Sequence, residues 1–236
     1  MRQRSASGAS KSSQLVLASA SPRRREILQA AGIAFRVHPT SVIERQKRGE
    51  TPREFVRRMA IEKAEAARAA LQERATLSIP GAILGADTIV VVGARTLGKP
   101  RSPADARRML RLLSGREHRV LTGLCLLYVN GSQSGSPKKA ASAEQWKRRV
   151  RVATTTVRFR RLSPAEIAEY VATGEPFDKA GAYAIQGRAC KYVQQIRGCY
   201  FNVVGMPISL LYEMLCEMLK GMKGRSCLAA NFHGVD

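Results

Sequence analysis

The stretch that decides the fold is ILGADTIVVVGARTLGKP, residues 83–100. Its first ten residues form an apolar run rich in valine and isoleucine and bounded by glycine, which predicts a buried β-strand. The chain turns at Gly93 and returns to Gly98, so we predict a hairpin with a basic tip. One acidic residue, Asp87, lies in the middle of the run.

Asp87 is out of place in a buried strand. An ionised carboxylate in an apolar interior is costly unless a cation or metal meets it. Because its own strand contains no charged neighbour, Asp87 is a candidate for catalysis or for metal binding. The alternative is a structural aspartate that caps nearby backbone groups, and the strand alone does not decide between them.

The hairpin contains a misleading motif. Residues 93–99, GARTLGK, match the spacing of a phosphate-binding P-loop, but Pro100 follows where the motif requires Ser or Thr. Proline supplies neither a Mg²⁺-binding hydroxyl nor a backbone N–H for phosphate. The strand–loop–helix order of a P-loop is also missing, so this site class is excluded.

Composition narrows the class of protein. The chain has 236 residues, enough for one large or two small domains with a proper core. No apolar run approaches the roughly 20 residues needed to span a bilayer, so no membrane partner is expected. Five cysteines without a CxxC pair predict thiols in a reducing compartment rather than disulfides or zinc, and hence a cytoplasmic protein.

The net charge favours polyanionic partners. Lys and Arg number 40 against 18 Asp and Glu, an excess of 22. Nucleic acid, an anionic membrane or phosphorylated small molecules would suit this excess, as would a merely solvated basic surface. Aromatic residues are few and no recognition helix or RNA motif is present, so nucleic acid is not expected as a partner.

Strands and helices alternate along the chain, which predicts an α/β fold. Four helices are predicted to start at a Ser-Pro or Thr-Pro pair, because proline suits the first helical position. Strands are predicted at 15–18, 34–38, 83–92, 118–129 and 150–161, with another ending at 203–207, and a last helix at 207–220. Residues 1–14 are predicted to be a disordered basic lead-in, 15–220 the folded domain, 130–149 a flexible insertion and 221–236 a tail.

Two groups of basic residues are poorly explained as surface charge. Arg23 and Arg24 lie in the first turn of a predicted helix, where the helix dipole disfavours cations unless an anion is bound there. Lys63 follows Phe55 and Met59 at helical spacing, so it lies on an apolar face. Surface arginines and a lysine that reaches to solvent are the alternatives.

Four segments together resemble the Maf family of nucleoside triphosphate pyrophosphatases. They are LASASPRR (17–24), GADT (85–88) with LGKP (97–100), DKAGAYAIQG (178–187) and NVVGMP (202–207), in the order found in the family. The similarity extends from about Leu15 to Lys220. Ala184 departs from the pattern, because the family usually has glycine there.

The resemblance implies a mixed α/β fold like that of inosine triphosphate pyrophosphatases, with two lobes around a cleft, in a protein that is often a homodimer. It also implies hydrolysis of a nucleoside triphosphate to the monophosphate and pyrophosphate with Mg²⁺ or Mn²⁺. By position, Asp87 matches the general base, and Asp87 and Glu44 are the expected metal ligands. The other matching cleft residues are Ser19, Arg23, Arg24, Lys63, Lys99 and Gln186.

Three positions indicate a subgroup of the family. Members that resemble dTTP/UTP pyrophosphatases carry Arg, Thr and Gln where this chain has Arg23, Thr88 and Gln186. Those that resemble 7-methyl-GTP pyrophosphatases carry Trp, Gln and Glu. We therefore expect dTTP and UTP as substrates, with a 7-methyl-GTP pyrophosphatase, or a nucleic-acid-associated regulatory protein linked to septum formation, as alternatives.

Overall fold

The computed structural model describes residues 15–73, 81–129 and 146–221. Within them, seven strands form one mixed sheet in the order β2-β1-β3-β5-β6-β7, and β4 pairs with β3. β1 is parallel to β2 and β3, and the other pairs are antiparallel. The strands are β1 (Leu15–Leu17), β2 (Phe35–Val37), β3 (Ala82–Val92), β4 (Arg95–Leu97), β5 (Glu117–Val129), β6 (Trp146–Phe159) and β7 (Val193–Arg197).

The predicted helix starts are confirmed. The helices are α1 (Pro22–Ala30), α2 (Pro52–Glu73), α3 (Pro103–Leu113), α4 (Pro164–Ala172), α5 (Tyr200–Val204) and α6 (Ile208–Gly221), with 3₁₀ turns η3 (Glu175–Asp178), η4 (Ala180–Ala182) and η5 (Arg188–Tyr192). Thr51 and Ser163 form capping boxes with glutamates three residues later. Ser21 occupies the N-cap position of α1, but its side chain makes no capping hydrogen bond.

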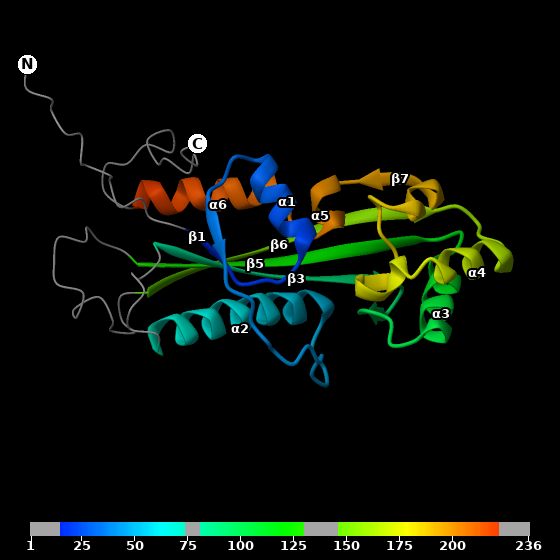
Figure 1. The fold of residues 1–236 in the computed structure, drawn as a ribbon, viewed down its shortest axis with the longest axis horizontal. Coiled ribbons are helices and arrows are strands. Elements are labelled where there is room, and N and C mark those ends of the chain that lie inside the picture. Colours follow the sequence, from blue (N-terminus) through cyan, green and yellow to red (C-terminus); the bar gives the residue numbers. More distant parts are fainter. Residues whose placement is uncertain (1–14, 74–80, 130–145, 222–236) are drawn as a thin grey trace, which may run out of the picture.

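Three long strands, β3, β5 and β6, run the length of the molecule (Figure 1). α2 packs along one face of the sheet, and α1, α5 and α6 lie over the other. α3 and α4 pack together at the far end. The α/β class predicted from the alternation of elements is therefore confirmed, as is the mixed sheet that the family resemblance implied.

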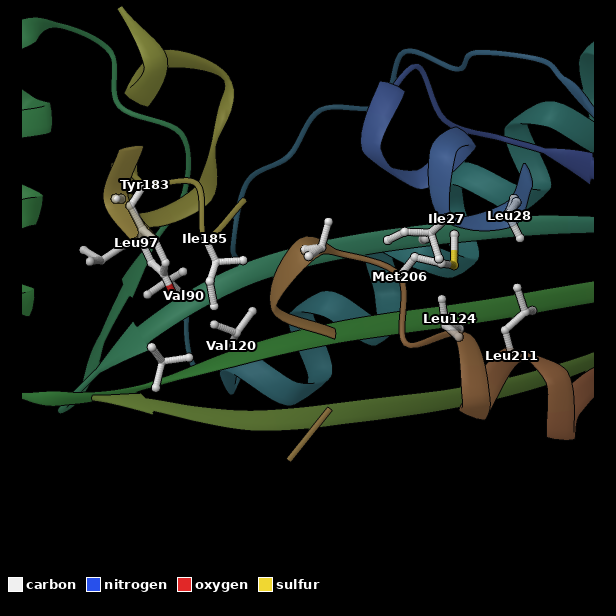
Figure 2. Packing of buried hydrophobic residues seen from close by; sticks show 14 of the residues in the cluster. Ile27, Leu28, Val90, Leu97, Val120, Leu124, Tyr183, Ile185, Met206 and Leu211 are labelled. Carbon is white, nitrogen blue, oxygen red and sulfur yellow. The ribbon is translucent and has the colours of Figure 1, made fainter. Parts of the chain in front are cut away.

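The larger part of the core lies on the α1 and α6 face. There Leu124 of β5 packs near Leu211 of α6, and Met206 lies beside Ile27 of α1 (Figure 2). Smaller clusters fill the α2 face, one of them around Phe55 and Met59. Because side chains alternate along a strand, Asp87 shares this second face with the apolar residues Ile83, Ile89 and Val91.

The structure corrects three predictions about the strands. Residues 203–207, predicted to end a strand, contain the end of α5 and a left-handed Gly205 (φ 110°). β7, a short strand with three polar residues, was not predicted. β6 begins at Trp146, opposite Val129, so residues 146–149 belong to a strand and not to the insertion.

Other sequence predictions fall partly outside the described residues. The lead-in 1–14, the remainder of the insertion (130–145) and the tail beyond Gly221 all lie outside, and they stay predictions. Cys125, Cys190 and Cys199 carry free thiols, whereas Cys216 is disulfide-bonded, so the prediction of thiols throughout is wrong there. Among the described helices, none combines the length and apolar character needed to cross a membrane.

Candidate active site

A gap in the sheet along one edge of β3 creates the cleft. β1 pairs with Ala82–Leu84, and β4 pairs with Val90–Val92 on the same edge. Among the described strands none pairs with residues 85–89 on this edge. Ligands of α/β sheets bind beyond the carboxyl ends of parallel strands, where the strand order changes direction. The topology therefore leaves Asp87 at the opening.

The cleft has a volume of about 1020 Å³, at the upper end of the roughly 300–1,000 Å³ typical of small-molecule sites. Segments far apart in the sequence meet in its walls. All nine residues predicted from the sequence line it: Ser19, Arg23, Arg24, Glu44, Lys63, Asp87, Thr88, Lys99 and Gln186.

Two carboxylates meet on one ammonium at the centre of the cleft. The Nζ of Lys63 donates to Oδ1 of Asp87 at 2.7 Å and to Oε1 of Glu44 at 2.6 Å. Lys63 and Asp87 are buried, with exposed fractions of 8% and 5%, whereas Glu44 is open to solvent. Lys63 therefore points into the site, as one of the two sequence interpretations predicted.

Burial and charge act in opposite directions on the two carboxyl groups. Burial raises the pKa of Asp87, and the nearby Lys63 ammonium only partly opposes it. Burial also disfavours ionisation of Glu44, but Lys63, Lys99 and Arg24 outweigh it and hold the pKa of Glu44 below its usual value. Two acids on one lysine thus differ in proton affinity, with Asp87 the better proton acceptor.

Two glycines bring Lys63 within reach of Asp87. A Cβ at Gly85 would lie 2.1 Å from the backbone oxygen of Ala60, and one at Gly123 would lie 2.3 Å from that of Val56. Gly123 pairs directly with Asp87 across β3 and β5. α2 can therefore approach the sheet closely at the level of the carboxylate, which no residue with a side chain would permit.

The segment that carries Glu44 is held by an ion pair outside the cleft. Arg58 of α2 donates from Nε to Oε1 of Glu50 at 2.6 Å and from Nη2 to Oε2 at 2.7 Å, and Nη2 also reaches the carbonyl of Arg45. Hydrogen bonds from Arg58 hold the pKa of Glu50 at about 2, so the pair persists at neutral pH. This two-point contact fixes the segment just after Glu44.

Arg24 replaces the missing strand neighbour of β3. Its Nη1 donates to the carbonyl of Ala86 and to Oγ of Ser19, both at 2.9 Å, while Nε donates to the carbonyl of Gly205 at 2.9 Å. Its Nη2 donates to Oγ1 of Thr88 at 3.1 Å. Burial lowers the pKa of Arg24, although Asp87 and Glu44 oppose this. Arg24 thus orders the cleft wall and adds positive charge behind it.

Other cations lie nearer the opening. Arg23 pairs with Asp178 at 3.0 Å, while Lys99 and Gln186 are exposed. Sequence analysis did not single out several further polar residues of the lining: Gln46, Arg101, Asp105, Arg108, Asp178 and Lys179. Asp178 and Lys179 lie in the DKAGAYAIQG segment, which could have signalled them, whereas Arg101 and Arg108 resemble ordinary surface arginines in the sequence.

A buried polar network behind the cleft was also missed. Oγ1 of Thr88 lies 3.0 Å from Oγ1 of Thr122, which donates to the carbonyl of Asn202 at 3.3 Å. The fully buried Asn202 donates from Nδ2 to Oγ1 of Thr155 and to the carbonyl of Val120, both at 3.0 Å. The network ties α5 to the sheet beside the site. In the sequence, Asn202 followed by two valines gives no indication of this network.

The described part of the chain contains no cluster of three or more His, Cys, Asp or Glu residues suited to a metal ion. Asp87 and Glu44 nevertheless direct one oxygen each to a single cationic position, which Lys63 occupies. Magnesium sites commonly use one or two carboxylates and complete their shell with substrate phosphates. The donor set therefore fits a divalent ion that arrives with its substrate.

A family model described as Maf-like protein matches residues 14–218. A protein of Anaeromyxobacter dehalogenans (strain 2CP-C) named dTTP/UTP pyrophosphatase is 50% identical over 196 residues, 83% of this chain and 89% of that protein. Relatives of the same name from Syntrophus aciditrophicus (strain SB) and Moorella thermoacetica (strain ATCC 39073 / JCM 9320) are 43% and 46% identical. They cover 86% of this chain each, and 89% and 94% of their own lengths.

Proposed function

Because the chain belongs to the Maf family, we propose that it hydrolyses nucleoside triphosphates to the monophosphate and pyrophosphate, with dTTP and UTP preferred. The observation that carries this proposal is the buried Asp87 carboxylate, held by Lys63 inside a cleft whose wall also contains Arg23, Arg24 and Lys99. An acid at the centre of a cationic cleft suits attack by water on a polyanion.

In the proposed reaction, water attacks the α-phosphorus and its oxygen forms the new P–O bond. Asp87 accepts the proton of that water, and its raised pKa makes it a better base than an exposed aspartate. The bond from the α-phosphorus to the bridging oxygen breaks, and that oxygen leaves with pyrophosphate. Arg23, Lys63 and Lys99 would offset the charge that develops on the leaving group.

The proposal includes a divalent cation, Mg²⁺ or Mn²⁺, held by Asp87 and Glu44. When bound, the ion would neutralise charge on the phosphate oxygens. Lys63 would exchange its present contact with the two carboxylates for one with the triphosphate. Glu44, whose pKa lies below its usual value, is ionised at neutral pH and so ready to act as a ligand.

Substrate choice is assigned to Gln186, Thr88 and Arg23. The Gln186 amide can donate one hydrogen bond and accept another, which matches the O4 and N3–H edge of uracil or thymine. A cationic methylated purine would instead favour an aromatic face and a carboxylate. CTP presents the reversed pattern at its 4-amino edge, so it should be a weaker substrate than UTP.

Pyrophosphate release from purified protein tests the proposal. With Mg²⁺ or Mn²⁺, UTP and dTTP should yield pyrophosphate and the monophosphate, and competition should rank UTP above CTP and 7-methyl-GTP. A Gln186→Glu variant should lower the ratio of UTP to 7-methyl-GTP turnover. Orthophosphate as the only product, or no turnover with any triphosphate, would refute the proposed reaction.

The two alternative functions are not favoured. Curated relatives that cover most of the chain are named for dTTP and UTP, not for 7-methyl-GTP. The basic residues that line the cleft suit a small polyanion, so the excess of positive charge does not require a nucleic-acid partner. Salt-dependent DNA binding by a protein that releases no pyrophosphate would reverse this ranking.

Assembly and location complete the proposal. We infer a homodimer, supported by the exposed aromatic side chains of Tyr200 and Phe201 in α5 and Tyr212 in α6. Light scattering of the purified protein would decide the stoichiometry. We also infer a cytoplasmic location, supported by the exposed free thiol of Cys190; the disulfide of Cys216 weighs against a fully reducing compartment, and fractionation would decide between the two.

A further inference from the structure

Gln186 lies at the corner of a turn whose neighbours are anchored in the core. The backbone N–H of Gly187 donates to the carbonyl of Ala184 at 3.1 Å, which closes the turn over residues 184–187. Ile185 and Tyr183 are buried and pack beside Val90 (Figure 2). Gln186 is exposed and lines the cleft. The direction of its amide therefore depends on how firmly the turn is held.

Two side chains from outside the cleft hold the turn at both ends. Tyr170 of α4 accepts a hydrogen bond at its hydroxyl from the backbone N–H of Ala184 at 3.1 Å, and donates to Oε1 of Glu175 at 2.8 Å. Oε2 of Glu175 accepts from the backbone N–H of Arg188 at 3.1 Å. The two anchored amides lie two residues before and two residues after Gln186.

Glu175 also packs directly against the turn. A Cβ at Gly187 would come within 2.3 Å of Oε1 and 2.5 Å of Cδ of Glu175, so no side chain fits between them. The carboxylate thus supports the peptide that follows Gln186 by direct contact as well as by hydrogen bonding. Tyr170 is itself buried, with an exposed fraction of 2%, and belongs to the capped helix α4.

We propose that Tyr170 and Glu175 are positioning residues for substrate choice, which fix the 184–188 turn so that the Gln186 amide meets the base of a pyrimidine nucleotide. This inference rests on the role proposed above for Gln186. Neither residue is part of the cleft lining, so each acts through the turn. Loss of either contact frees the amide to rotate, and a freely rotating amide accepts the edge of cytosine as readily as that of uracil.

The test compares three variants. Tyr170→Phe removes the acceptor of the Ala184 amide, and Glu175→Gln leaves one acceptor where the carboxylate offers two. Ser163→Ala is the matched control, because it removes the cap of the same helix, where Oγ accepts from the N–H of Glu166 at 3.2 Å, without touching the turn. For each protein we would measure kcat/KM for UTP and CTP by pyrophosphate release.

We expect the UTP:CTP ratio to fall by about three- to ten-fold in Tyr170→Phe and Glu175→Gln, the effect of one lost hydrogen bond. Ser163→Ala should keep the wild-type ratio even if it unfolds at a lower temperature. A purely structural role would lower stability in all three and move the ratio in none. If Tyr170→Phe and Glu175→Gln both fold and both retain the wild-type UTP:CTP ratio, the inference is overturned.

Amide hydrogen exchange separates this inference from the proposed function. Exchange at residue 184 should accelerate in Tyr170→Phe, and exchange at residue 188 should accelerate in Glu175→Gln, whether or not the protein turns over UTP. A wild-type protein that releases no pyrophosphate would refute the proposed function alone. Unchanged exchange at both amides would show that Tyr170 and Glu175 do not hold the turn, and would overturn the inference.

Discussion

Replacement of Asp87 by asparagine separates charge from shape at the centre of the site. The amide fills the same volume and its oxygen can still accept from Lys63, which lies 2.7 Å from Oδ1 in the native protein. Lys63 also keeps Glu44 at 2.6 Å, so its ammonium does not lose its counter-charge. What disappears is the buried carboxylate of the cleft, which could take a proton from water.

The expected loss of activity is large. A positioned general base contributes about 10²- to 10⁴-fold, or about 2.7 to 5.4 kcal/mol of activation free energy. We therefore expect kcat for UTP to fall at least 100-fold in Asp87→Asn, in line with the lower figure. Glu65→Gln provides the matched control, because it removes one negative charge from α2 at an ion pair with Arg68.

The expected change in stability has the opposite character. Burial raises the pKa of Asp87 above its ordinary 3.8, so the folded protein binds more protons than the unfolded chain between these values. Stability is therefore lost as the pH rises through the folded pKa, and at pH 7 the ionised carboxylate weakens the fold. Asparagine escapes this penalty, and the free energy of unfolding should be unchanged or higher.

Steady-state pyrophosphate release and urea unfolding at pH 7 measure the two effects. Near-native turnover in a folded Asp87→Asn protein would return Asp87 to the structural role that the sequence left open. A drop in unfolding free energy of about 3–5 kcal/mol, the cost of leaving a buried charge unpaired, would refute the argument that Glu44 suffices for Lys63.

Three further changes test other parts of the structure. Arg58→Met should lower kcat/KM about ten-fold, equivalent to about 1.4 kcal/mol, because it frees the segment that carries Glu44. Arg58→Lys should restore part of the lost kcat/KM. Equal kinetics in the two variants would contradict a role for Arg58 in holding this segment. His118 has a folded pKa of about 4 against an ordinary 6.5, so acidification between these values should cost the native protein up to about 3 kcal/mol of unfolding free energy. His118→Phe should flatten that pH dependence in urea unfolding, and an equally steep decline would contradict the assignment. Gly85→Ala should lose at least about 1–3 kcal/mol of unfolding free energy and most activity, because its Cβ would lie 2.1 Å from a backbone oxygen of α2. Gly98→Ala, whose Cβ meets nothing within 4 Å, is the control for stability, and equal loss in both would contradict the packing argument.

The candidate site was predictable where local chemistry conflicted with local structure. An acid in an apolar strand led to Asp87, and a lysine on an apolar helix face led to Lys63, because both violate the pattern of their own element. Arg24 illustrates the limit. Its place in the first helical turn indicated an anion, but its hydrogen bonds to Ala86 and Gly205 depend on strands and turns that are distant in sequence.

The elements that the sequence missed are those fixed by tertiary contacts. Val203 and Val204 favour a strand by propensity, but the buried Asn202 and its partners Thr122 and Thr155 hold this segment as α5. β7 is a short edge strand whose polar residues show little alternation. Neither the network nor the edge position leaves a periodic signal within its own segment.

The close contact of α2 with Gly85 and Gly123 has a consequence for how such a protein can change over time. The distance between α2 and the sheet fixes the position of Lys63 relative to Asp87. The close contacts at Gly85 and Gly123 leave no space there for a larger residue. The 184–188 turn, by contrast, is held by hydrogen bonds to two polar side chains, Tyr170 and Glu175. Substitutions in that turn could therefore change which nucleotide is accepted while the reacting groups stay in place. Substitution of Gly85 or Gly123 would instead displace Lys63 from Asp87 and abolish the hydrolysis of every substrate.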